Sequence, residues 1–249
     1  MSAKNEHPPT VWARETQQRA RPTLSRAHIV AEAIRLLDTD GIEGLSMRRL
    51  GAQLGAGATS LYRHVANKDE LIELAVDAVY GELSLSDRAD LADWRGGVTR
   101  TANRMRELIL RHPWIAAVSA ETGLSYLGPN VMRACEDVLA IFVAAGCTIE
   151  DADLAVNTVF AYVIGATTGE AALTMKLASR GLDVSEWADG LRAAAERAAR
   201  PYPHAYQAYL SYAGRESRDI AETQFTQGLQ LILDGVAPLT DHPSPPSGR

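Results

Sequence analysis

Cysteine is scarce in this sequence, with only Cys135 and Cys147 among 249 residues. Two cysteines are too few for a disulfide framework, and their positions match no metal-ligand spacing. Free thiols of this kind are typical of proteins in the reducing cytosol, where they serve as small apolar core residues. We therefore expect a cytoplasmic protein without a metal site.

Long hydrophobic runs are missing as well. The most apolar stretch, 154–173, is interrupted by Asn157, three threonines and Glu170, which argues against a membrane span. Residues 1–15 are polar and lack the apolar core of a secretory signal peptide. The sequence therefore predicts no membrane partner.

The signature motifs of several large enzyme classes are absent too. The chain has no P-loop, no HExxH motif, no GxSxG motif and no GxGxxG motif that follows a strand. Gly55 and Gly57 lie instead inside a predicted helical hairpin. An enzyme is therefore the less favoured class, and we expect neither catalytic residues nor a cofactor.

Positive charge is concentrated at one end of an otherwise acidic chain. The whole sequence has 25 basic and 31 acidic side chains, a net charge of −6. Residues 1–68 contain ten of the basic and six of the acidic side chains, a net charge of +4, so the other 181 residues have a net charge of −10. This asymmetry predicts that a polyanion is attracted to the first segment and repelled by the rest.

Apolar residues recur with helical periodicity along most of the chain, and no convincing segment alternates as a strand does. The predicted fold class is therefore all-α. Residues 1–23 and 238–249 are polar, contain several prolines and show no sustained period. We expect them to form a disordered arm and a disordered tail.

Four helices are predicted near the N-terminus, and the middle two are short. Ser25, Ser46 and Asn67 are favourable N-caps for the first, second and fourth of them. Gly41 and Gly55 can adopt the left-handed backbone with which a helix ends. The apolar side chains that would hold the short pair against the first helix are Leu50, Leu54, Leu61 and Val65. Two short helices joined at a glycine are typical of a helix-turn-helix, although any helical hairpin can have a glycine at its corner.

Longer helices are predicted in the remainder of the chain. Their approximate ranges are 94–111, 129–146, 149–176, 184–200 and 217–235. The helix over 149–176 is apolar on several sides and must therefore be covered on several sides.

Two motifs in the predicted helix-turn-helix identify a family. They are Leu45-Ser-Met-Arg-Arg-Leu50 and Ser60-Leu-Tyr-Arg-His-Val65 with the Ala-Asn-Lys-Asp69 that follows. With the rest of 24–71 they resemble the DNA-binding domain of the tetracycline repressor (TetR) family, in which Leu-Tyr-x-His-Val ends the helix-turn-helix and a lysine opens the next helix. A looser resemblance to the family's C-terminal effector domain comes from His112-Pro-Trp114, Gly128-Pro-Asn130 and Phe225-Thr-Gln-Gly-Leu229.

The resemblance implies a DNA-binding surface. The side chains that would face the bases are Arg48, Ala58, Thr59 and Ser60. The side chains that would contact phosphates are Tyr62, His64 and Lys68. The chemistry agrees, because Tyr and His donate hydrogen bonds to phosphate oxygens and Lys68 begins a helix whose amides attract phosphate. Arg63 could either donate a pair of hydrogen bonds to guanine or hold a phosphate.

Plainer structural interpretations of these residues remain open. Tyr62 could pack on the first helix, His64 could hold the turn, and one of Arg48 and Arg49 could be merely solvated. Because Ala58 can offer only a methyl contact to thymine, we expect specificity to depend on arginines and on DNA shape. The arm could enter the minor groove or remain a solvated tail; its arginines nearest the first helix are Arg14, Arg19 and Arg21.

The family resemblance further implies a homodimer, in which the helices near 149–176 and 217–235 form a four-helix bundle with their copies. Gly165 and Gly169, four residues apart, would permit close helix approach. An intramolecular core is the alternative for these apolar helices.

A pocket for a small-molecule effector is also implied. The family's tetracycline-binding and Mg²⁺-binding pattern is not recognisable here, so tetracycline is not the expected ligand. Pockets are lined mainly by apolar side chains with a few polar anchors. The candidate lining residues are Arg104, Met105, Trp114, Tyr126, Met132, Phe142, Phe160, Tyr162 and Trp187.

Together these features predict a ligand-responsive repressor that binds a palindromic operator as a homodimer. The expected organisation is a helix-turn-helix DNA-binding domain over 24–70, joined by a linking helix to an effector-binding and dimerisation domain over 71–237. A transcriptional activator of the same architecture, or an effector-binding helical protein that does not bind DNA, remains an alternative.

Overall fold

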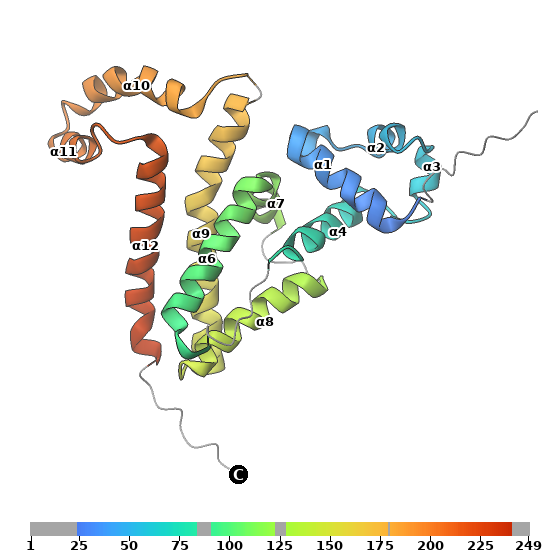
Figure 1. Ribbon diagram of the computed structural model, residues 1–249, viewed down its shortest axis with the longest axis horizontal. Coiled ribbons are helices and arrows are strands. Elements are labelled where there is room, and N and C mark those ends of the chain that lie inside the picture. The colour runs from blue at the N-terminus through green and yellow to red at the C-terminus, as the bar shows by residue number, and fades with distance from the viewer. Residues whose placement is uncertain (1–23, 84–90, 123–127, 179, 241–249) are drawn as a thin grey trace, which may run out of the picture.

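The computed structural model describes residues 24–83, 91–122, 128–178 and 180–240, which form helices and no strand (Figure 1). The N-terminal helices are α1 (Arg26–Gly44), α2 (Met47–Gln53), α3 (Ala58–Leu61) and α4 (Lys68–Tyr80). The others are α6 (Trp94–Arg111), α7 (Trp114–Thr122), α8 (Pro129–Ala144), α9 (Ile149–Ala178), α10 (Val184–Ala199), α11 (Pro203–Ser211) and α12 (Ser217–Thr240). The predicted all-α class is confirmed, whereas the predicted arm and residues 241–249 of the predicted tail lie outside the described residues.

The predicted N-caps begin the N-terminal helices. The hydroxyl of Ser25 accepts a hydrogen bond from the amide of His28 at 3.2 Å. The hydroxyl of Ser46 accepts one from the amide of Arg49 at 3.2 Å. The side-chain oxygen of Asn67 accepts from a main-chain amide one turn into α4 at 2.7 Å. These bonds satisfy donors that have no partner within the first helical turn.

Gly41 and Gly55 have positive φ angles of 67° and 60°. At Gly55 the chain turns from α2 toward α3, as predicted. Gly41 instead produces a kink inside α1, which continues for a short turn to Gly44. The prediction that the chain leaves the first regular helix through a left-handed Gly41 is therefore confirmed, and the short turn to Gly44 follows the kink.

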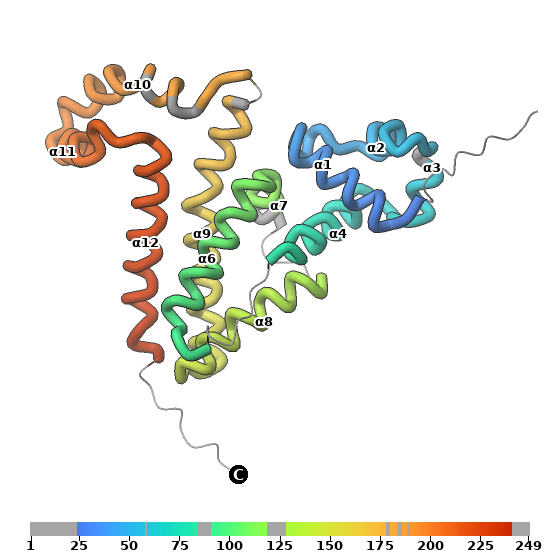
Figure 2. Tube along the Cα trace, in the orientation of Figure 1, coloured from blue at the N-terminus to red at the C-terminus, as the bar shows by residue number. Residues whose placement is uncertain are grey.

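The helices form two lobes (Figure 1). We call α1–α3 the head and α6–α12 the body, and α4 lies between them (Figure 2). In the body α9 packs against α6, α8 and α12, while α10 and α11 join the upper ends of α9 and α12. Because α4 contacts both α1 and α8, and α1 also contacts α7, the head is held by two separate elements of the body.

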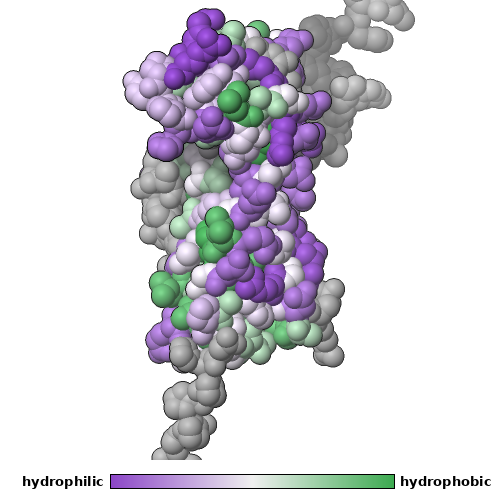
Figure 3. Space-filling model, turned by 90° about the vertical axis from the view of Figure 1, so that its left-hand side faces the viewer, coloured by the Kyte–Doolittle hydropathy of each residue, from purple (hydrophilic) through white to green (hydrophobic). Residues whose placement is uncertain are grey.

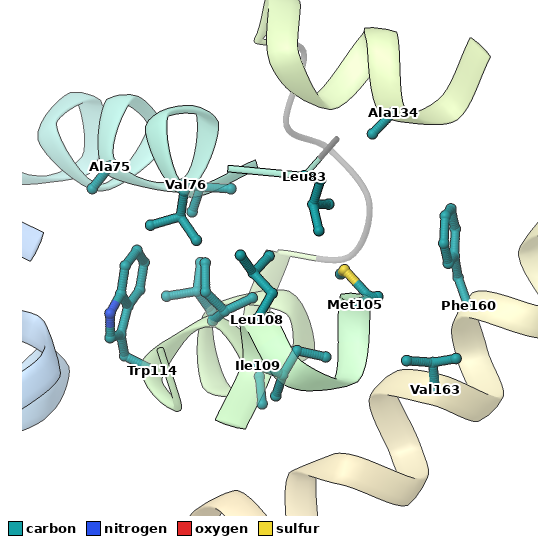
Figure 4. Close-up of a cluster of buried hydrophobic side chains, with 14 of the residues drawn as sticks. Ala75, Val76, Leu83, Met105, Leu108, Ile109, Trp114, Ala134, Phe160 and Val163 are labelled. Atoms are coloured by element: carbon teal, nitrogen blue, oxygen red, sulfur yellow. The ribbon is translucent and has the colours of Figure 1, made fainter. Parts of the chain in front are cut away.

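One hydrophobic core runs from the head into the body. Figure 4 shows Val76 of α4 close to Leu108 of α6 and Trp114 of α7, with Met105 beyond them toward Phe160 of α9. The core contains no break between the lobes. Packed side chains therefore connect the body to the head without a gap, and close-packed interiors deform little.

The structure adds two helices that periodicity did not predict, and it lengthens a third. α7 and α11 are nine residues each, too short for a clear repeat, and both follow or begin with a proline. Proline is compatible with the first turn of a helix. α12 continues to Thr240 through Pro238, so the predicted tail begins too early; Leu239 packs against the core and secures this last turn.

Candidate DNA interface and ligand cavity

The helix-turn-helix is fixed from inside by apolar side chains. Leu50, Leu61 and Val65 are buried in the hydrophobic core, and α2 contacts both α1 and α3. Main-chain hydrogen bonds close the corner: the amide of Ala56 donates to the carbonyl oxygen of Gly51 at 2.9 Å. The hairpin is therefore a rigid support for the side chains on its outer surface.

Most of the predicted DNA-binding side chains project from this support into solvent. The exposed side chains among them are Arg48, Thr59, Ser60, Tyr62 and Arg63. The Tyr62 side chain is 52% exposed, so packing on α1 does not account for it. Ala58 begins α3, and its side chain lies outside what the structure describes.

Three basic side chains of this region contact the protein itself. Both Arg48 and Arg49 are exposed, but Arg49 is held by Asp40 at 2.6 Å and by the carbonyl oxygen of Gly44. Arg26 donates to the main-chain oxygen of His64 at 3.1 Å, and the His64 side chain is half-buried.

The third of these basic side chains, Lys68, donates to the carbonyl oxygen of Ile42 at 2.9 Å. This bond ties the start of α4 to the end of α1. A lysine ammonium has three donors, so it can keep this bond while it meets a phosphate. The contact to α1 was not predicted from the sequence.

A polar joint connects α1 with the beginning of α7. One carboxylate oxygen of Asp38 accepts a hydrogen bond from the indole of Trp114 at 2.8 Å and lies 2.7 Å from Nδ1 of His112. The other ring nitrogen of His112 lies 3.4 Å from a carboxylate oxygen of Glu82. Trp114 is 1% exposed and bound to Asp38, so it belongs to this joint; its role as a pocket residue stays a prediction.

A second polar joint connects α4 with α8. The carboxylate of Asp77 accepts from the main-chain amide of Asn130 at 2.8 Å, from the Asn130 side chain at 2.9 Å and from the amide of Val131 at 3.2 Å. Asp77 thus caps the N-terminus of α8, where the helix dipole favours a negative charge. The Gly128-Pro-Asn130 segment resembles the family's effector domain, but the sequence does not predict its partner on α4.

The body contains a cavity of about 760 Å³ between α6, α9 and α12. Its lining residues are Arg106, Leu110, Tyr162, Ala166, Gly169, Glu170, Leu173, Thr174, Asp183, Ser217, Arg218, Ala221, Gln224 and Phe225. The volume falls in the range of about 300–1,000 Å³ that is typical of small-molecule sites. Of the predicted effector residues that the structure describes, Tyr162 is the one in this lining.

The other predicted effector residues are elsewhere. Met105, Phe142 and Phe160 are packed in the core. Arg104, Met132 and Trp187 are exposed on the outer surface. Tyr126 lies outside the described residues. Residue type alone does not separate core from cavity wall, because both use the same apolar and aromatic side chains.

The cavity wall has a charged pair that the sequence did not single out as a site. Arg106 of α6 binds the carboxylate of Glu170 of α9 at 2.7 Å, and its guanidinium lies 5.1 Å from the centre of the Phe225 ring. The Phe225 ring stacks on Tyr162, whose hydroxyl donates to the main-chain oxygen of Phe225 at 2.9 Å. Burial raises the pKa of Tyr162, and nearby Arg106 opposes that rise.

The outer faces of α9 and α12 are smooth and partly apolar. A side chain at Gly165 or at Gly235 would meet open space. Leu154 and Leu231 project outward, and Leu231 is 74% exposed. Figure 3 shows hydrophobic patches separated by hydrophilic residues on the side of the molecule that carries α12. Gly169, the other glycine predicted to allow helix approach, lines the cavity.

Within the described ranges, no group of three or more His, Cys, Asp or Glu side chains could hold a metal ion. Across the same ranges, no helix is both long and apolar enough to cross a bilayer.

A helix-turn-helix head joined through a shared core to a helical body with a ligand-sized cavity defines a one-component transcription regulator. Residues 29–75 match the family described as bacterial regulatory proteins, tetR family. Residues 89–239 match the tetracyclin repressor-like C-terminal domain. The chain belongs to the tetracycline repressor family of helix-turn-helix regulators, which are not enzymes.

Curated relatives resemble the chain over most of its length. It is 36% identical to an HTH-type transcriptional regulator of Saccharopolyspora erythraea, over 92% of each protein. It is 32% identical to the HTH-type transcriptional repressor DrrR1 of Streptomyces coeruleorubidus, over 87% of this chain and 78% of that protein.

Solved structures share the fold. The Streptomyces coelicolor TetR family protein ActR in complex with actinorhodin superposes with a TM-score of 0.70 at 25% identity, over 88% of this chain and 99% of ActR. BioQ with its double-stranded DNA operator superposes with a TM-score of 0.59 at 26% identity, over 86% of this chain and 99% of BioQ. Relatives of this chain thus bind operator DNA and small molecules.

Proposed function

We propose that this regulator is a cytoplasmic repressor that binds a palindromic operator as a homodimer and leaves it when a small molecule occupies the body. The observation that carries this proposal is the outward-facing side of the helix-turn-helix, which is exposed, basic and supported by buried leucines. The proposed division is a DNA-binding domain over 24–70 and an effector-binding and dimerisation domain over 71–237. The repressor DrrR1, the ActR complex and the BioQ complex support it by similarity.

The head supplies two kinds of DNA contact. In the proposed complex the base-facing side chains are Arg48, Ala58, Thr59 and Ser60, and the phosphate-facing side chains are Tyr62, His64 and Lys68. Arg63 stands beside them and can form a bidentate pair with guanine. The exposure of Arg48, Tyr62 and Arg63 leaves each of them free of the head's core.

Two heads are needed for a stable complex, because one helix-turn-helix buries little surface and reads a short half-site. The proposed dimer pairs α9 and α12 with their copies in a four-helix bundle. The open space beside Gly165 and Gly235 would let helix backbones approach closely. The exposed Leu154 and Leu231 would then be buried.

Release follows from a change in the spacing of the two heads. Successive half-sites on one face of DNA are about 34–36 Å apart, so a ligand that favours another spacing disfavours DNA binding. The joint at Asp38 fastens the head to α7, and the joint at Asp77 fastens α4 to α8, which makes α4 and these joints the path from body to head. A coupling of about 1–3 kcal/mol is typical of such effects.

Selection of bound sequences from random duplex DNA, at physiological salt, tests the proposal. Enrichment of a palindrome with half-sites about one helical turn apart is expected. No enrichment by a protein that is dimeric in solution would contradict operator binding. A promoter fusion measured with and without the gene separates repression from activation. Removal of a repressor raises expression from the promoter, whereas removal of an activator lowers it.

A further inference from the structure

The cavity between α6, α9 and α12 has an ion pair in its wall. Arg106 and Glu170 meet at 2.7 Å, and their side chains are 15% and 28% exposed, so both are largely withdrawn from solvent. The same wall has apolar residues such as Leu110 and Leu173, and its other polar residues are Tyr162, Thr174, Asp183, Ser217, Arg218 and Gln224. Charges in such surroundings interact more strongly than charges on an open surface.

The two partners of this pair are held differently. Arg106 is the less exposed of the two, and its guanidinium rests on the Phe225 ring of α12. An arginine cannot lose its charge in a protein, and its planar fork matches a carboxylate. Glu170 is the more exposed partner and can turn toward water at lower cost. Arg106 is therefore the fixed half of the pair, and Glu170 is the half that another anion can replace.

Aromatic rings and small residues in the wall favour a flat aromatic occupant. Ala166 and Gly169 of α9 and Ala221 of α12 are the small residues, and a side chain at Gly169 would meet open space. The Tyr162 and Phe225 rings also line the cavity and are stacked, with centroids 5.7 Å apart. The hydroxyl of Tyr162 is bound to the main chain of α12, so these two residues offer mainly aromatic surface.

We propose that this cavity binds a planar aromatic carboxylate whose carboxylate group displaces Glu170 from Arg106. The assignment rests on the proposed function, because it identifies the cavity as the effector site and gives its ligand class. The exchange also breaks the ion pair that links α6 to α9. Arg106 lies six residues before His112, about 9 Å along the axis of α6. Loss of the ion pair therefore changes the support of the helix end whose His112 contacts Asp38.

The test is titration of the full-length protein, without DNA, with three fluorescent probes of equal ring size. Pyrene-1-carboxylate, pyrene-1-carboxamide and 1-pyrenemethylamine are followed by fluorescence anisotropy. The carboxylate is expected to bind at least about tenfold more tightly than the neutral amide, since a favourable charge contact changes an equilibrium by about a factor of ten or more. Equal affinities, or a preference for the amine, would overturn the assignment.

Substitution of Glu170 gives the sharper result. In Glu170→Gln the competing negative charge is gone, so pyrene-1-carboxylate should bind about tenfold more tightly while the amide is unaffected. Glu107→Gln, on the exposed side of α6, removes the same charge outside the cavity and should leave both affinities unchanged. Weaker or unchanged carboxylate binding by Glu170→Gln would show that Glu170 does not compete with the ligand, and would overturn the displacement.

Removal of the cation is the complementary test. Arg106→Met alone leaves Glu170 unpaired, so the double variant Arg106→Met/Glu170→Gln is measured as well, with thermal unfolding by circular dichroism as the check on folding. The preference for carboxylate over amide should vanish in the double variant; its persistence would overturn the role of Arg106. If the protein enriches an operator sequence but shows no preference for the carboxylate probe, this ligand assignment alone is contradicted. If it prefers the carboxylate probe but enriches no operator, the regulator function alone is contradicted.

Discussion

The head and the body of this protein present their polar groups in opposite ways. In the head, Arg48, Tyr62 and Arg63 stand on the outside of a hairpin whose apolar side chains are hidden. In the body, Arg106 and Glu170 meet in the wall of a cavity. An exposed basic surface can meet a large polyanion from outside, whereas a cavity can surround much of a small molecule.

The boundary between the two regions is polar on the outside and apolar within. Asp38 and Asp77 gather hydrogen bonds from α7 and α8, while Val76 and Trp114 continue the core between the lobes. A hydrogen-bonded joint has preferred distances and angles, and close-packed side chains have few alternative arrangements. In the proposed release mechanism, this combination would let a change in the body reposition the head without unfolding it.

The largest effect is expected from Leu50→Ala, which asks whether head and body are one folding unit. Leu50 is fully buried, so its truncation should lower the free energy of unfolding by about 2–5 kcal/mol. Because the lobes share one core, thermal unfolding by circular dichroism should stay a single transition at a lower temperature. The exposed Leu91→Ala serves as control and should change stability by less than about 0.5 kcal/mol. Two separate transitions would show that the head unfolds alone.

Asp38→Ala tests the joint itself. It leaves the buried indole N–H of Trp114 without its acceptor, which should cost about 1–3 kcal/mol in urea unfolding. Asp38→Asn retains a carbonyl oxygen and should lose less. If both variants were as stable as the original protein, the joint would have no part in holding the lobes together.

Arg63→Ala tests whether the exposed surface of the head reads bases. If Arg63 pairs with guanine, the variant should relax the preference at one base pair by about 1–3 kcal/mol in competition between operators with single substitutions. Arg49→Ala is the matched control, since Arg49 is bound to Asp40 and should not alter base preference. An unchanged preference in Arg63→Ala would assign the side chain to the DNA backbone.

The smallest and most uniform effect is expected from Lys68→Ala. Loss of one phosphate contact should weaken binding to every DNA sequence alike and reduce the slope of affinity against salt concentration by about one unit. Lys176→Ala, which removes the same charge from an exposed position on α9, should leave the slope unchanged. A loss confined to one operator sequence would contradict the phosphate role.

The elements that sequence reasoning recovered are those specified by neighbouring residues. Ser25, Ser46 and Asn67 cap helices because a cap needs only a side-chain oxygen and the amides one turn ahead. The long helices over 94–111 and 149–176 were predicted within a few residues because many turns repeat the same apolar period. The nine-residue helices α7 and α11 contain too few turns for that signal.

The cavity shows where this local reasoning stops. Aromatic and apolar residues were chosen by type, and most of them proved to be core or surface, as Phe142 and Met132 illustrate. Arg106, Glu170 and Phe225 come from three helices far apart in the chain, and no local pattern connects them. Trp114 has an indole donor that could have indicated a hydrogen-bond partner, but the sequence does not say that the partner is Asp38.

The sequence by itself determined the helical class, the caps and turn of the helix-turn-helix, the charge difference between the two ends, and the family. Each depends on composition or on residues a few positions apart, whose interactions are set by backbone geometry. Only the tertiary structure decided which buried residues face a cavity, which basic side chains are held by the protein, and how Asp38 and Asp77 join head to body. Those features depend on contacts between distant segments, and packing alone brings such segments together.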